Sequence, residues 1–219
     1  VDLLCSARLG RTLMTLAPEC ATSAQVAELT KRGVIVAAGH SDATYETAQT
    51  AIDAGLSGAT HLFNAMSQLT GRAPGVIGAA LDDDRIFAGI IVDGHHLHAA
   101  SVRLAVRAKG ADRLMLVTDA MSTVGGNQDE FLLDGRRIYR KGDRLQDDAG
   151  TLAGSTLTMT RAVQGMMQVA AMPLLDAVTM ASATPAAFLG LGDRGIIAVG
   201  NMADLIAVDD DLTMRASWI

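Results

Sequence analysis

Short apolar runs alternate with amphipathic stretches along the first half of the chain. Each run is bounded by glycine or polar residues, as in strands buried on both faces, and the runs occupy residues 12–17, 34–38, 58–60, 85–93 and 114–118. The stretches between them predict helices at about residues 23–32, 45–54 and 99–108. Parallel strands must be joined by such crossovers, so the alternation predicts a parallel sheet of about five βα units.

Further elements are expected on either side of this pattern. Ser23 is expected to cap the first crossover helix and Gly33 to end it. After residue 119, turn signals at Asp134-Gly135 and Lys141-Gly142 predict a β-excursion over residues 130–148. The remaining expectations are helices at residues 2–10, 157–169, 174–181 and 185–189, a loop at 67–78 and a strand-forming tail at 195–208.

Composition favours a globular enzyme. The 219 residues are 49% hydrophobic, enough to build a core, while a net charge of −6 and 3% aromatic residues argue against a nucleic-acid surface. No apolar stretch reaches the roughly 18 residues of a membrane span, and no secretory signal is visible. Cys5 and Cys20 lack metal or redox spacing. We therefore expect a cytoplasmic protein with reduced cysteines.

Three polar residues follow predicted parallel strands. His40 and His61 stand at the ends of two successive apolar runs, and Asp119 ends the fifth. A single histidine in such a place is more often a hydrogen-bonded structural residue. Two histidines whose strands end on the same side of a sheet instead favour a metal site of the kind that (β/α) barrels build. Asp119 would then be a third ligand or the base that takes a proton from bound water.

Other candidates carry less weight. Glu19 follows the first strand, and the pattern alone gives equal weight to two interpretations, a metal ligand and an outward carboxylate in a turn. His95, His96 and His98 are close in sequence, yet neighbouring residues point in different directions, so one or two of them at most can reach one site. Arg72, in a Gly-Arg-x-Pro-Gly loop, suits a phosphate or carboxylate, although most loop arginines are simply solvated.

Six motifs, in order, carry a resemblance to a known family. They are Gly39-His40-Ser41-Asp42-Ala43-Thr44, Thr60-His61-Leu62-Phe63-Asn64-Ala65-Met66, Gly71-Arg72-x-Pro74-Gly75, Asp93-Gly94-x-His96, Val117-Thr118-Asp119-Ala120 and Gly154-Ser155-x-Leu157-Thr158-Met159. Together they resemble the N-acetylglucosamine-6-phosphate deacetylases of the amidohydrolase superfamily, from about Leu13 to the end of the chain. The resemblance implies hydrolysis of the acetamide of N-acetylglucosamine 6-phosphate to glucosamine 6-phosphate and acetate.

The resemblance also implies a role for each matching residue. His40 and His61 match metal ligands, Asp119 matches the catalytic aspartate, and the substrate-binding positions match Asn64, Ala65, Arg72, His96, Leu152, Ala153 and Gly154, with Arg72 on the phosphate. The implied cofactor is a divalent ion, with zinc favoured and iron or another divalent metal as the alternative. The implied partners are a small phosphosugar and, in the full-length protein, a second copy of the chain, with neither nucleic acid nor membrane.

The implied fold is an α/β TIM barrel, (β/α)8, of which this chain would hold about the last five βα units. Residues 1–195 would form that partial metal-hydrolase domain, and residues 196–219 a C-terminal strand segment of a small β-sandwich domain. The family's metal-binding glutamate lies in a His-Leu-Glu-Gly-Pro motif, which is absent here. Glu19 belongs to a different motif, so we expect it to be structural or to support a metal ligand without touching the metal. The chain is accordingly expected to be an N-terminally truncated piece.

Two rival interpretations stay open. Another amidohydrolase could act on a different N-acyl or cyclic amide, although Arg72 would then lack a phosphate partner. Alternatively, the chain is an inactive fragment that keeps the motifs but lacks the metal-binding glutamate. Metal analysis of the purified chain would separate these interpretations.

Overall fold

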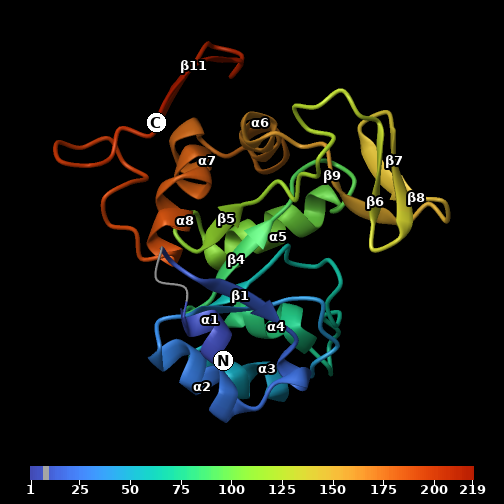
Figure 1. Ribbon diagram of the computed structural model, residues 1–219, viewed down its shortest axis with the longest axis vertical. Coiled ribbons are helices and arrows are strands. Elements are labelled where there is room, and N and C mark those ends of the chain that lie inside the picture. The colour runs from blue at the N-terminus through green and yellow to red at the C-terminus, as the bar shows by residue number, and fades with distance from the viewer. Residues whose placement is uncertain (7–9) are drawn as a thin grey trace.

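The computed structural model describes residues 1–6 and 10–219 and is built around a parallel sheet (Figure 1). The sheet contains β1 (Leu13–Leu16), β2 (Ile35–Ala38), β3 (Gly58–Ala59), β4 (Phe87–Ile90) and β5 (Leu114–Leu116), in that order. Each strand pairs in parallel with the next along the chain. The predicted parallel sheet is therefore confirmed, with strands shorter than expected.

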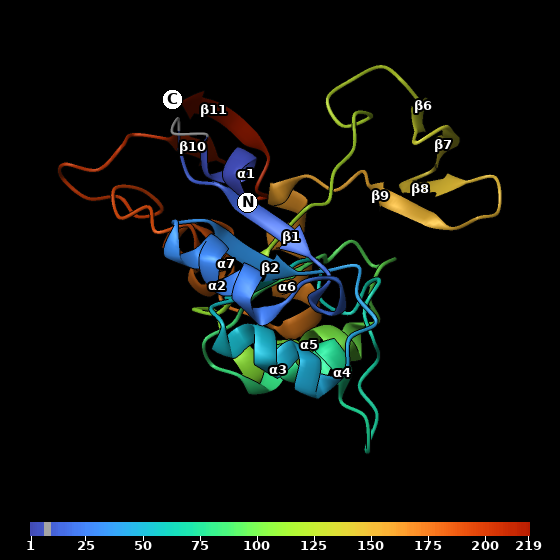
Figure 2. The ribbon, with the colours of Figure 1, turned by 60° about the horizontal axis from the view of Figure 1, so that its bottom comes forward.

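Helices connect the strands, as parallel pairing requires. They are η1 (Pro18–Cys20) and α2 (Ser23–Lys31) after β1, α3 (Tyr45–Asp53) after β2, α4 (Gly75–Asp82) after β3 and α5 (Ala99–Lys109) after β4. Helices α3, α4 and α5 lie next to one another along the sheet (Figure 2). The short helix α1 (Asp2–Ser6) precedes β1, and residues 7–9 of the helix expected there lie outside the described residues.

The cap of α2 corrects an expectation. Thr22, and not Ser23, is the N-cap: its hydroxyl accepts from the Gln25 N–H, and the Gln25 side chain accepts from the Thr22 N–H. This reciprocal pair satisfies two backbone donors that the first turn of the helix leaves free. Gly33 does follow the end of the helix, with φ of 86°.

Helix α4 corrects a second expectation, because a loop was predicted up to residue 78. Gly75 and Gly78 lower helix propensity, which is why the local pattern indicated a loop. The helix is nevertheless buried along most of its length, from Gly75 to Ala80. Packing therefore overrides propensity here.

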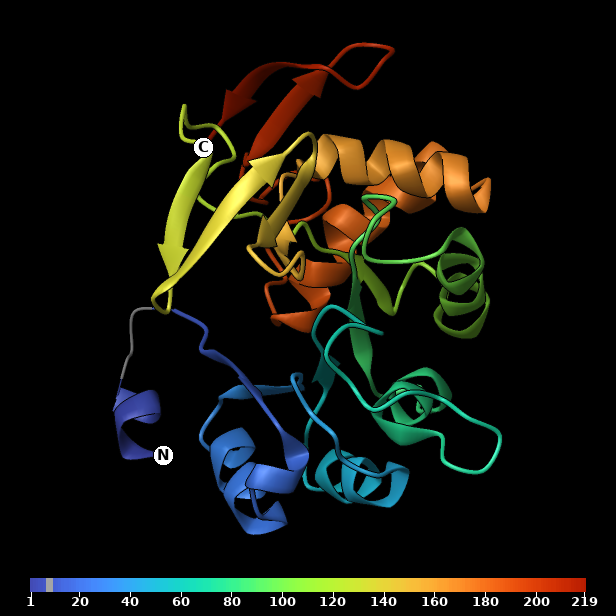
Figure 3. The same cartoon turned by 90° about the vertical axis from the view of Figure 1, so that its right-hand side faces the viewer.

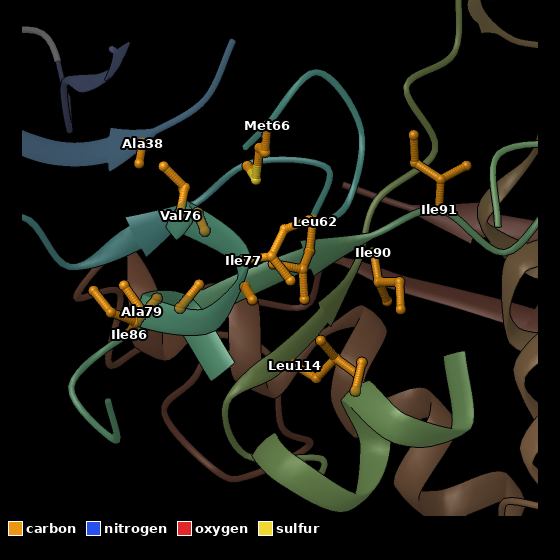
Figure 4. Packing of buried hydrophobic residues seen from close by; sticks show 14 of the residues in the cluster. Ala38, Leu62, Met66, Val76, Ile77, Ala79, Ile86, Ile90, Ile91 and Leu114 are labelled. Atoms are coloured by element: carbon orange, nitrogen blue, oxygen red, sulfur yellow. The ribbon is translucent and has the colours of Figure 1, made fainter. Parts of the chain in front are cut away.

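The hydrophobic core lies between the sheet and its helices (Figure 4). Ile77 of α4, Ile90 of β4 and Leu62, which follows β3, are each at most 1% exposed. Burying side chains of this size contributes about 1.5–3 kcal/mol each, which makes the core a firm base for the loops at the strand ends.

A second, antiparallel sheet follows β5 and extends to one side of the parallel sheet (Figure 3). It consists of β6 (Glu130–Leu133), β7 (Arg136–Lys141), β8 (Arg144–Asp147) and β9 (Leu152–Ser155). The predicted β-excursion is confirmed, and the substrate-binding candidates at residues 152–154 belong to a further strand of the same sheet, β9. The reason is that β9 pairs antiparallel with β8, with Leu152 opposite Gln146. At the end of β9, the Ser155 N–H also donates to the Asp119 carbonyl at 2.8 Å, which joins this strand to the turn after β5.

The C-terminal part contains the three predicted helices and a two-stranded sheet. The elements are α6 (Met159–Ala170), α7 (Leu174–Ala181), α8 (Ala183–Phe188), β10 (Leu205–Val208) and β11 (Met214–Trp218). The strand expected over residues 195–208 was wrong in its first part, since only Leu205–Val208 pairs, antiparallel with β11. Among the described residues, no helix has the length and apolar character to cross a membrane.

Candidate active site

Two imidazoles meet just beyond strands β2 and β3. His40 and His61 lie at the same edge of the sheet because their strands are parallel neighbours. Their Nε2 atoms are 3.0 Å apart, and their rings meet edge to face with centroids 4.8 Å apart. Two lone-pair-bearing nitrogens aimed at each other form a natural pair of ligands for one cation.

The backbone at these positions is strained. His40, His61 and Asp119 adopt φ values of 50°, 26° and 51°, in the left-handed region that side-chain-bearing residues rarely enter. Such strain costs on the order of 1–3 kcal/mol per residue and persists only where surrounding contacts enforce it. One such contact is the hydrogen bond from the Ser41 N–H to the Ala65 carbonyl, which ties together the turns after β2 and β3. Phe63 and Ala65, in the turn after His61, also have positive φ, so five of the eight described non-glycine residues with this conformation lie in the turns at these strand ends, which indicates a functional site.

The histidine pair fits a divalent metal. Burial lowers the pKa of the His61 imidazole, which favours the neutral form that binds metals. A separation of 3.0 Å between the Nε2 atoms suits two nitrogens that share one ion at about 2.0–2.1 Å from each. The described residues contain no cluster of three or more His, Cys, Asp or Glu side chains that could hold such an ion. His40 and His61 therefore need a further donor to complete a site.

A cavity of about 520 Å³ brings most of the predicted site residues together. Nine of the ten predicted residues line it, which are His40, His61, Asn64, Ala65, His96, Asp119, Leu152, Ala153 and Gly154. They come from the ends of the parallel strands and from β9. The arrangement places a possible proton acceptor, Asp119, in the same space as the two imidazoles.

His96 is held in place by Asp93. One Asp93 oxygen lies 2.7 Å from His96 Nδ1, and the other accepts from the backbone N–H groups of His95 and His96 at 2.8 and 2.9 Å. Burial alone would raise the pKa of Asp93, but these hydrogen bonds hold it well below its usual range. With Nδ1 engaged, Nε2 is the ring nitrogen left for a substrate in the cavity. Sequence reasoning noted Asp93 only as part of a motif.

The remaining sequence candidates lie elsewhere. Arg72 is exposed and is not among the residues that line the cavity. Glu19 accepts from Ser41 Oγ at 2.6 Å and from the Asp42 N–H at 2.8 Å, so it braces the turn that carries His40. His98 caps α5. His95 faces the antiparallel sheet, where its Nε2 is 2.9 Å from an Asp143 oxygen and its Nδ1 accepts from Arg144 Nε at 3.0 Å.

Sequence reasoning missed one wall of the cavity. Five further lining residues are Met121, Leu133, Arg136, Asp147 and Thr151, three of them in strands of the antiparallel sheet. The turn signal at Asp134-Gly135 could have shown that Leu133 and Arg136 pair across a hairpin. No local signal shows that this hairpin faces the ends of the parallel strands.

Comparison with known proteins places the chain in a family. A model of the amidohydrolase family matches residues 12–218. The chain is 47% identical to an N-acetylgalactosamine-6-phosphate deacetylase from a Shewanella species over 96% of its length. It is 39% identical to an N-acetylglucosamine-6-phosphate deacetylase from Haemophilus influenzae over 93% of its length. In each case it covers 54% of the relative, so the chain spans about half the length of these proteins.

A solved structure supports the same assignment. The crystal structure of N-acetylglucosamine-6-phosphate deacetylase from Pasteurella multocida matches the whole chain with a TM-score of 0.95 and 40% sequence identity, and 57% of that structure is covered. The histidines at the strand ends and the strained backbone around them are consistent with the family match over residues 12–218. The chain belongs to the amidohydrolase family.

Proposed function

We propose that the protein hydrolyses the acetamide of an N-acetylhexosamine 6-phosphate, with N-acetylglucosamine 6-phosphate as the first candidate. The products would be glucosamine 6-phosphate and acetate. The observation that carries this proposal is the cavity that His40, His61, His96 and Asp119 share. The names of the similar proteins supply the substrate class.

Members of the amidohydrolase family typically bind a divalent metal. In this chain His40 and His61 would hold it, and when bound it would act as a Lewis acid that makes water more acidic and polarises the carbonyl group. Zinc is our first choice for two imidazoles, with iron or another divalent ion as the alternative. The third protein ligand would be a glutamate outside residues 1–219, as the resemblance implies.

The chain's own residues would carry the proton. Asp119 would accept a proton from the water that attacks the acetyl carbon and would pass it to the departing amine nitrogen, so that it ends the cycle unprotonated. His96, positioned by Asp93, would contact the acetyl carbonyl oxygen through Nε2. Asn64, Ala65 and the β9 residues Leu152–Gly154 would line the sugar.

The finer architecture is also a proposal. We propose that residues 1–195 form the last five βα units of a (β/α)8 barrel and that residues 196–219 belong to a small β-domain. The sequential order of the five parallel strands and the separate pairing of β10 with β11 support this division. We further propose a cytoplasmic homodimer that acts on a small phosphosugar and binds neither nucleic acid nor membrane.

Arg72 stays a proposed phosphate ligand, although its geometry alone gives no support. Its side chain is exposed and outside the cavity, so it would need movement of its loop or a second copy of the chain to reach a substrate there.

A second candidate substrate is N-acetylgalactosamine 6-phosphate, the epimer at C4. It is favoured by the 47% identity to the Shewanella protein, against 39% for the Haemophilus protein. Both candidates share the same reacting amide and the same phosphate, so they differ only in one hydroxyl that the cavity must distinguish.

The test is acetate release from both epimers by the intact, metal-loaded protein, with the unphosphorylated sugars and a cyclic amide as comparison substrates. We expect the highest kcat/KM on one of the two phosphorylated sugars. The same assay shows which of the two epimers has the higher kcat/KM. Activity on the cyclic amide without any on the phosphosugars would contradict the proposal.

A further inference from the structure

The carboxylate of Glu19 acts next to the proposed metal site without being part of it. Glu19 follows β1 in the short helix η1 and is not among the residues that line the cavity. Within the described residues, no third His, Cys, Asp or Glu side chain joins His40 and His61 in a cluster that could hold an ion. An effect of Glu19 on the metal must therefore pass through other residues.

Glu19 uses both of its carboxylate oxygens on the turn that follows His40. Its Oε2 accepts from Ser41 Oγ at 2.6 Å, and its Oε1 accepts from the Asp42 N–H at 2.8 Å. The Ser41 oxygen in turn accepts from the Ala43 N–H at 3.1 Å, so its own hydrogen is free to point at Glu19. Two charge-assisted contacts from one carboxylate fix both the position and the orientation of the turn.

Ser41 connects this turn to the turn after β3. Ser41 is only 3% exposed. Its N–H donates to the Ala65 carbonyl at 3.0 Å, and its carbonyl accepts from the Ser67 N–H at 2.9 Å. Both bonds belong to one parallel bridge between the two turns. The turns that carry the two histidines are therefore joined through Ser41, and Glu19 anchors Ser41 to η1.

The residue on the other side of His40 is fixed as well. The Gly39 N–H donates to the Leu16 carbonyl at 3.1 Å, and a Cβ added at Gly39 would lie 2.2 Å from Thr60 Cγ2. His40 thus lies between two anchored residues, and its φ of 50° is one that persists only where surrounding contacts enforce it. The 3.0 Å approach of its Nε2 to His61 Nε2 depends on that conformation.

We propose that Glu19 is a positioning residue for the metal ligand His40 and acts through Ser41. The role rests on the proposed function, since the ion is the one that the proposed hydrolase would use. A ligand that is already held in its binding geometry binds more tightly than one that must be ordered first. Replacing residues that orient metal ligands typically lowers metal affinity by about 10–100-fold.

The carboxylate is needed because both of its partners are donors. A glutamine at this position offers one oxygen that accepts and one NH2 group that donates. The NH2 group would face either the Asp42 N–H or the Ser41 hydroxyl, whose hydrogen would then lose its acceptor. Glu19→Gln therefore breaks one of the two contacts at almost unchanged size, and Glu19→Ala breaks both.

The test is the zinc affinity of the intact protein, measured by competition with a chromophoric chelator, which needs no turnover. We expect Glu19→Ala to raise the zinc dissociation constant by about tenfold or more, and Glu19→Gln to raise it by a smaller factor. Ser41→Ala should also weaken binding. In a double-mutant cycle, Glu19→Ala should cost less affinity when residue 41 is already alanine, because the two side chains act together.

Two control variants separate positioning from other effects. Glu28→Gln removes an exposed negative charge from α2, which tests whether any lost carboxylate weakens the attraction to a cation. Thr22→Ala removes the cap of the same helix and lowers stability without touching the turn that carries His40. Both controls should bind zinc as the wild-type protein does.

Several outcomes would overturn this role of Glu19. They are an unchanged zinc affinity in Glu19→Ala, an equal loss in Thr22→Ala or Glu28→Gln, and a loss that is undiminished when residue 41 is already alanine. The visible spectrum of the Co²⁺-substituted protein supplies a second readout, because it depends on the number of metal ligands. An unchanged spectrum in Glu19→Gln supports positioning, and a changed coordination number would make Glu19 a ligand instead.

Failure of this role and failure of the proposed function are distinguishable. If the wild-type protein releases acetate but Glu19→Ala binds zinc like the controls, the positioning role is wrong and the proposed function stands. If the wild-type protein binds zinc but releases acetate from no sugar, the proposed function is wrong, and the zinc affinities still decide for or against Glu19. A wild-type protein that binds no divalent metal would refute the positioning role whatever its activity.

Discussion

Asp119 has a strained backbone, lies at the end of a strand and carries a carboxylate that can accept a proton. It follows β5, adopts φ of 51°, lines the cavity and is tied to β9 through its carbonyl oxygen. We read the strain as the consequence of aiming the side chain into the cavity.

Replacing Asp119 should stop the chemistry and leave the metal in place. Asp119→Asn keeps the size of the side chain but cannot accept a proton. In the intact protein we expect kcat to fall by at least about a hundredfold, the scale of general acid–base catalysis, with metal content equal to wild type. Steady-state kinetics and elemental analysis check this. Near-normal turnover would remove Asp119 from the mechanism.

Asp93 should make stability depend on pH. Its pKa is lowered in the folded protein, so the carboxylate stabilises the fold above its ordinary unfolded value of about 4 and loses that contribution as the pH falls below it. Urea unfolding between pH 7 and pH 3 should show a weaker loss of stability on acidification for Asp93→Asn than for wild type. Asp134→Asn, in an exposed turn, is the control and should follow wild type. Identical acid profiles for Asp93→Asn and wild type would contradict the assigned hydrogen bonds.

Among the elements, β9 connects the two sheets and lines the cavity. Gly154 sits where it passes Asp119, with φ of 71°, and a Cβ added there would lie 2.3 Å from Met121 Cγ and 3.0 Å from the Asp119 carbonyl oxygen. A side chain at this position must push β9 away from Asp119. Glycine is therefore required by both backbone conformation and space.

Gly154→Ala should lower activity and stability together. We expect a loss of about 1–3 kcal/mol in the free energy of unfolding and at least about a tenfold fall in kcat/KM. Gly150→Ala is the matched control: its φ is 83°, yet nothing lies within 4 Å of the added Cβ. The control should lose only the backbone strain, about 1 kcal/mol, and should keep its activity. Equal activity losses in the two variants would show that strain, not contact with Asp119, is responsible.

At the scale of the whole molecule, the described chain leaves apolar surface uncovered. Strands β1 and β5 are the edges of the parallel sheet. Ile197, Val199 and Trp218, in the C-terminal part, are 88%, 108% and 54% exposed. Exposed apolar residues and free strand edges promote association.

Residues 1–219 expressed alone should therefore aggregate, or form a soluble oligomer, with less than one metal per chain and no acetate release. Two histidines are too few ligands for a stable hydrolytic site. Light scattering, metal analysis and an acetate assay check this expectation. A monodisperse monomer with one tightly held metal and measurable deacetylation would contradict it and would make Glu19 a candidate third ligand again.

The structural features that the sequence determined by itself depend on neighbouring residues or on the order of the strands. Short apolar runs predicted the parallel strands, and their common direction predicted that His40, His61 and Asp119 would meet, because parallel strands end on one side. The Asp134-Gly135 turn likewise predicted a hairpin. These features depend on neighbouring residues or on a rule that holds for every parallel sheet.

Only the tertiary structure decided which other side chains reach the cavity. Arg136 lines it and Arg72 does not, although both are loop or hairpin arginines in the sequence. The physical reason is that hydrogen bonds between distant residues, such as Ser155 to Asp119 and Arg144 to His95, set the direction of the antiparallel sheet. Helix α4 also depends on tertiary structure, because the burial of most of its residues outweighs the cost of two glycines to helix propensity.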